Sequence, residues 1–162
     1  MNISQDRINK ARNIVGWYTL AASAKGAVPI PAASVAIVGN NTYMISHVGV
    51  AMGETVHWQD VAASFGIMAG VNMIGRSVFI EGAKALSWGT GSFWALAGVS
   101  ALGASTAALQ TYLVGTITIQ MCLNGGAALE RAQAKRVISN ARGDYKAFVA
   151  EMKSKNLSAP GA

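Results

Sequence analysis

Four titratable side chains stand close together near the middle of the sequence: His47, Glu54, His57 and Asp60. His47 and Glu54 share a helix face if one helix continues through Gly53, and His57 and Asp60 share another face. Imidazole and carboxylate groups are suitable metal ligands. Neither an HExxH motif nor a cysteine-rich spacing accompanies them. The sequence therefore favours a polar turn between two helices over a metal site, with His47 hydrogen-bonded inside a helical bundle.

The single cysteine, Cys122, lies in an apolar segment without an activating neighbour in sequence. Apolar surroundings raise the pKa of a thiol, so we expect a buried side chain rather than a nucleophile. One cysteine also excludes an intramolecular disulfide and indicates a reducing compartment. No glycine motif of a phosphate-binding loop is present. We expect no catalytic residue, no cofactor and no metal ion, and hence no enzyme.

Two long segments contain no charged residue at all. They cover 28 positions at 26–53 and 45 positions at 85–129, and each exceeds the ~20 residues of a membrane-spanning helix. Polar side chains nevertheless occur inside them, at Asn40, Asn41, His47 and Gln110. Within a membrane such groups need partners in a helical bundle or line a wet cavity. We favour packing, while a pore or transport component remains the alternative.

Charge gathers at the two ends of the chain. Of 162 residues, 52% are hydrophobic and only 12% are charged, and the net charge is +6. Basic segments beside uncharged ones indicate cytoplasmic retention and contact with anionic lipid headgroups. Both ends are basic, so we expect both termini in the cytoplasm and an even number of crossings of a bacterial inner membrane. The residues expected to contact lipid or a partner are Arg7, Lys10, Arg12, Arg131, Lys135 and Arg136.

Other compartments and partners fit the sequence less well. The first apolar run follows Lys25, too late for a secretory signal, and no nucleic-acid reading element accompanies the basic residues. A soluble bundle is the other possibility, because charges recur between Glu54 and Lys84.

Apolar periodicity and glycine–proline punctuation predict an all-α bundle of about five helices, two of them membrane-embedded. The expected helices cover 4–25, the segment from Pro31 to 53, 57–86 as one helix or a broken pair, 92–124 and 127–154. They form one domain, 1–155, before a flexible tail at 156–162. Its parts are a basic amphipathic helix at 1–25, a hydrophobic core at 26–126 and a second basic amphipathic helix at 127–155.

Small side chains are dense in the longest uncharged segment. Small residues four positions apart allow two helices to approach closely, which predicts self-association into a homo-oligomer. The residues expected at these contacts are Gly98, Ser100, Ala101, Gly103, Ala104, Ser105 and Ala108.

Three motifs between residues 10 and 125 resemble a known family. They are Val28-Pro29-Ile30-Pro31 after an alanine-rich helix, Met44-Ile45, and Thr106-Ala107-Ala108-Leu109 after a glycine-interrupted turn. The chain resembles the YcjF-like domain of unknown function, without the GTPase domain. The resemblance implies a helical, membrane-associated protein linked to Era-like GTPases, and it carries over no catalytic residue.

These patterns together predict a non-enzymatic, self-associating, membrane-associated helical protein that acts as a scaffold or oligomeric assembly. Two alternatives to this function remain at this point. The first is an accessory module for a separate Era-like GTPase, and the second is a membrane pore or transport component.

Overall fold

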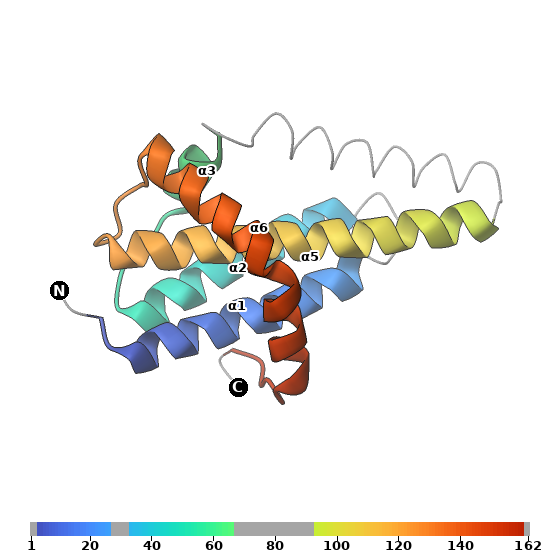
Figure 1. Ribbon diagram of the computed structural model, residues 1–162, viewed down its shortest axis with the longest axis horizontal. Helices are drawn as coiled ribbons and strands as arrows, with labels where there is room; N and C mark the ends of the chain where they lie inside the picture. Colours follow the sequence, from blue (N-terminus) through green and yellow to red (C-terminus); the bar gives the residue numbers. More distant parts are fainter. Residues whose placement is uncertain (1–2, 27–32, 67–92, 161–162) are drawn as a thin grey trace.

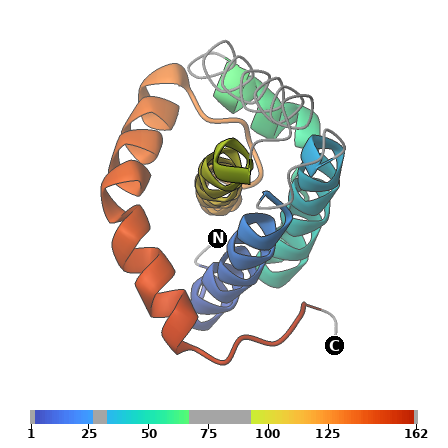
Figure 2. The same ribbon diagram turned by 90° about the vertical axis from the view of Figure 1, so that its right-hand side faces the viewer.

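The fold is organised around α5 (Phe93–Leu123), a 31-residue helix without a charged side chain. A helix that is apolar on every side has to be covered by other elements. The computed structural model describes residues 3–26, 33–66 and 93–160, without the side chains of 25–26, 33–38, 62, 65–66 and 93–106. Viewed along its axis, α5 lies at the centre, with α1, α2 and α6 around it (Figure 2).

The described residues form five helices and no strand, which confirms the all-α prediction. Four of them surround α5: α1 (Gln5–Gly26), α2 (Ala33–Met52), α3 (Trp58–Gly66) and α6 (Arg131–Ser154). The observed ends lie within a few residues of those predicted for the first, second and last two helices. For the helix or broken pair predicted at 57–86, the structure shows α3, which ends at Gly66. The rest of that segment lies within 67–92, outside the described residues.

The first helix runs antiparallel to α5 along most of its length (Figure 1). Ala22 packs on Ala107 near one end, and Val15 lies at Gly115 further along. A Cβ atom placed on Gly115 would lie only 2.5 Å from Cγ1 of Val15. The absence of a side chain at Gly115 therefore sets how closely the two helices approach.

Both α2 and α5 end in the same hydrogen-bonded turn. At the end of α5, the amide of Gly126 donates to the carbonyl of Met121 and that of Gly125 to Cys122. Glu54 and Gly53 repeat the pattern after α2, and Gly53 and Gly125 have φ of +77° and +70°. This is the Schellman motif, whose left-handed position glycine fills without steric cost. Glycine thus stops each helix where the chain must turn back.

The last helix, α6, crosses α5 and closes the bundle (Figure 1). Helical spacing in the sequence predicts its apolar stripe, and Ile138, Ala141, Phe148 and Met152 are buried against the other helices. The Tyr112 ring of α5 stacks at 4.4 Å from that of Phe148. The helix continues through Gly143 without a break.

The structure does not support the expectation that two helices are embedded in a membrane. Within the residues that the structure describes, no helix combines the length and the apolarity needed to cross a membrane. In α2, Asn40, Asn41 and His47 lower the mean hydropathy, and threonine and glutamine residues do the same in the second half of α5.

Two glycines inside helices are expected to respond oppositely to substitution by alanine. Gly115→Ala forces a methyl group against Val15, which we expect to lower the free energy of unfolding by about 1–3 kcal/mol. At Gly143 no other atom lies within 4 Å of the place that a Cβ would take. Gly143→Ala should therefore raise the free energy of unfolding by about 0.5–1 kcal/mol, because alanine has the higher helix propensity. Chemical denaturation measures both. Equal effects would contradict the close approach of α1 and α5.

Candidate functional site

The predicted polar intramembrane residues lie inside the bundle. Asn40 and Asn41 are 4% and 1% exposed, and Gln110 and His47 are half-buried. The hydroxyl of Thr111 on α5 donates to Oδ1 of Asn41 at 2.8 Å, and Nδ2 of Asn40 donates to the carbonyl of Tyr18 at 3.3 Å. These hydrogen bonds join α2 to its two neighbours. Buried polar groups need hydrogen-bond partners, and these two amides find theirs on neighbouring helices, which links the helices together.

His47 shares a 2.8 Å hydrogen bond between its Nδ1 and the hydroxyl of Tyr18. Burial raises the pKa of the Tyr18 phenol, and the nearby Tyr43 raises it further. The phenol is therefore neutral at pH 7. His57 is exposed in the turn before α3. Among the residues described, no group of three or more His, Cys, Asp or Glu side chains lies close enough to hold a metal ion.

Cys122 is 1% exposed at the end of α5. Desolvation and then the nearby Glu54 raise the pKa of the thiol to about 11. A thiol with this pKa is almost wholly protonated at neutral pH, and the thiolate is the reactive form. The prediction of a buried, unreactive cysteine therefore fits the site.

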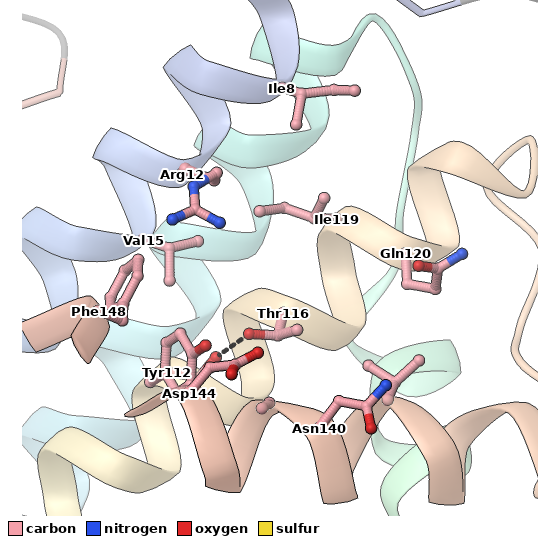
Figure 3. A pocket seen from close by; sticks show the side chains of 12 residues that line it. Ile8, Arg12, Val15, Tyr112, Thr116, Ile119, Gln120, Asn140, Asp144 and Phe148 are labelled. Atoms are coloured by element: carbon pink, nitrogen blue, oxygen red, sulfur yellow. Dashed lines mark hydrogen bonds between the residues drawn. The ribbon is translucent and has the colours of Figure 1, made fainter. Parts of the chain in front are cut away.

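A pocket of about 270 Å³ lies between α1, α5 and α6 (Figure 3). Its apolar wall includes Ile8, Val15 and Phe148. Its polar side chains come from all three helices and are Arg12, Tyr112, Thr116, Gln120, Asn140 and Asp144.

The pocket can form hydrogen bonds but holds few groups for acid–base chemistry. Arg12, Asp144 and Tyr112 are its ionisable residues, and burial raises the pKa of Tyr112. The hydroxyl of Thr116 already donates to the carbonyl of Tyr112 at 2.8 Å. The lining contains neither histidine nor cysteine nor a pair of carboxylates, the usual groups for proton transfer or nucleophilic attack. No pattern in the sequence predicts this pocket; the only local signal is the spacing of Asn140 and Asp144, which are four residues apart on α6.

The basic residues of the two chain ends meet at one point. Nη2 of Arg12 lies 3.1 Å from Oε2 of Glu151, and Nζ of Lys155 lies 2.7 Å from Oε1. Nζ of Lys155 also donates to Oδ1 of Asn13 at 3.3 Å. The hydrogen bond from Lys155, with Arg12 nearby, lowers the pKa of Glu151. Glu151 thus pairs with two cations and ties α6 to α1.

The remaining residues expected to contact lipid are exposed. Arg7 additionally donates from Nη1 to the carbonyl of Met52 at 3.3 Å, where it covers the end of α2. The others, Lys10, Arg131, Lys135 and Arg136, form no ion pair with another described residue and face solvent.

Only the last of the small residues expected at oligomer contacts has a described side chain. Ala108 is 4% exposed within the bundle, beside the contact of Ala107 with Ala22. The other six residues lie in the part of α5 whose side-chain surroundings are outside the described set: Gly98, Ser100, Ala101, Gly103, Ala104 and Ser105.

Comparison with family models, with curated proteins and with solved structures finds no match. The resemblance to the YcjF-like domain therefore stays a prediction from the motifs.

Two buried threonines of α5 allow a test of the link between α2 and α5. Thr111→Val removes the hydroxyl that donates to Oδ1 of Asn41, so this buried amide oxygen loses that hydrogen bond. We expect the loss to lower the free energy of unfolding by about 1–3 kcal/mol. Thr118→Val is the matched control, because Thr118 is equally buried but bonds to the carbonyl of Val114 in its own helix. Its cost should be below about 1 kcal/mol. Denaturant midpoints compare the two, and a larger loss from Thr118→Val would contradict this assignment.

The raised pKa of Cys122 predicts slow modification of the folded protein. With a pKa of about 11, only about one thiol in a thousand is ionised at pH 8, and the sulfur is buried. A disulfide reagent should label it slowly in buffer and rapidly in denaturant. Rapid, stoichiometric labelling of the folded protein would show that α5 is open at this end.

Proposed function

We propose that this chain is a non-enzymatic, self-associating helical protein that acts as a scaffold at a membrane. One observation carries the proposal. The 31 residues of α5 contain no charge, and the Phe93 end of this helix extends beyond the ends of α1 and α2 (Figure 1). The cations, in contrast, collect on the terminal helices. An uncharged projecting segment beside basic helices is the arrangement of a protein that meets a bilayer.

The pocket between α1, α5 and α6 is lined by neither histidine nor cysteine nor a pair of carboxylates, which favours a non-enzymatic role. That pocket has amide, hydroxyl, carboxylate and guanidinium groups, which suit binding. The internal hydrogen bonds of Asn40 and Asn41 support the packing role over the alternative of a pore, because a pore-lining amide faces water rather than a neighbouring helix.

Self-association rests on the small residues in the first half of α5. Positions 98–105 alternate glycine, alanine and serine with few large residues, which permits close packing against a second copy. The alternative of an accessory module for an Era-like GTPase follows from the family resemblance. In that case, the exposed side of α6 would be the docking surface.

The first test is fractionation and particle size of the full chain. We expect the protein to stay in the membrane pellet after an alkaline carbonate wash, and to form particles larger than a monomer in mild detergent by light scattering or electron microscopy. Release by carbonate together with a monomeric state without detergent would overturn the proposal.

A pair of alanine substitutions tests self-association more directly. Ala104→Leu places a large side chain among the small residues of α5 and should shift the particles toward monomer. Ala132→Leu is the control, since Ala132 is exposed on α6 and outside that segment. Unchanged particle size in Ala104→Leu would argue against this contact.

A further inference from the structure

The five cations of one flank of α6 lie almost in a line. At 3.6 residues per turn, Arg131, Lys135, Arg142, Lys146 and Lys153 fall within a sector of about 60°. We call these five residues the basic stripe. At 1.5 Å per residue it is about 33 Å long. All five are exposed, and none has an ion-pair or hydrogen-bond partner within 3–26, 33–66 and 93–160.

The acidic residues of α6 lie on its other flank. Asp144 and Glu151 are turned by about 160–200° from the middle of the basic stripe. Glu151 is paired with Arg12 of α1, and Asp144 lines the pocket between α1, α5 and α6. No carboxylate of α6 therefore offsets the charge of the basic stripe. Arg136 falls about 100° away from the stripe, on the solvent face between the two flanks.

The orientation of α6 fixes where the basic stripe points. The α6 residues that line the pocket, including Asn140 and Asp144, face Thr116 and Gln120 in the second half of α5 (Figure 3). The basic stripe is on the opposite flank. It therefore faces the side of the crossing on which the Phe93 end of α5 lies (Figure 1).

We propose that the basic stripe binds the headgroups of anionic phospholipids, with the uncharged Phe93 end of α5 directed toward the bilayer. This inference rests on the proposed membrane function and identifies the surface and lipid class. Ammonium and guanidinium groups form charge-assisted hydrogen bonds to phosphate oxygens. A line of five cations on the same side as an uncharged segment matches a bilayer, which presents negative charge outside an apolar interior.

A nucleic acid is the other polyanion that a basic stripe could bind. An anionic membrane fits better, because the same side of the molecule carries the charge-free end of α5, which has no complement on a nucleic acid backbone. The chain also lacks a recognisable nucleic-acid reading element.

The test is co-sedimentation of the full chain with vesicles. One set contains phosphatidylcholine alone and the other contains equal amounts of phosphatidylcholine and phosphatidylglycerol. The test variant is Lys135→Gln/Arg142→Gln/Lys146→Gln, and Arg136→Gln is the control because Arg136 is an exposed cation of the same helix. A basic residue near an anionic surface contributes about 1 kcal/mol, so each removed charge should weaken binding about fivefold.

We expect the triple variant to bind anionic vesicles about a hundredfold more weakly, and Arg136→Gln to change binding less than twofold. Helix content and Cys122 labelling confirm that each variant is folded. Unchanged binding of the triple variant, equal binding of the native chain to both vesicle sets, or stripe-dependent binding to a single-stranded nucleic acid in place of vesicles would overturn the inference. In the first two outcomes membrane association itself stands. No binding of the native chain to either vesicle set would count against the proposed function as well.

Discussion

The burial of the second half of α5 is the constraint on which the rest of the structure depends. A helix with no charge from Phe93 to Leu123 has no strongly polar face, so its neighbours approach this half on several sides. Small residues at Ala107 and Gly115 let α1 lie close, and Thr111 gives α2 a hydrogen-bonding partner within the interface. The aromatic ring of Tyr112 then provides the contact on which α6 crosses.

The distribution of charge follows from the same requirement. With α5 uncharged, the cations and anions of the described chain lie on the surrounding helices and their connecting turns, and α6 carries its cations and its carboxylates on different flanks. Its carboxylates face α1 and the pocket, while its cations face outward. The five cations of the basic stripe therefore concentrate positive charge on one flank of α6. This concentration is the physical basis of the proposed contact with an anionic surface.

Much of the fold is predictable from the sequence because its signals are local. Apolar spacing predicts α1 and the buried face of α6, and Gly125 with Gly126 marks the end of α5. The pocket cannot be found in this way, because its lining residues, such as Arg12 and Asp144, come together only after three distant segments assemble. Proximity in the chain groups Arg136 with Arg131 and Lys135, whereas helical geometry groups those two with Arg142. Gly143 lowers the helix propensity in the middle of α6, but the buried residues on both sides of it keep the helix continuous.

The pairing of the first helix with the last one also means that the bundle cannot be complete before α6 is available. Arg12 and Glu151 are separated by 139 positions, and Met152 packs at Gly16. During synthesis on the ribosome, α1 emerges well before α6, the helix that closes the remaining face of the bundle, whereas α5 directly precedes α6 in the chain. Contacts between such distant positions slow folding, and the apolar rows of the nascent chain stay uncovered until α6 has left the exit tunnel. The bundle is thus completed only after translation of its last helix, and until then the face of α5 that α6 covers stays open even where α1 and α2 already pack on α5.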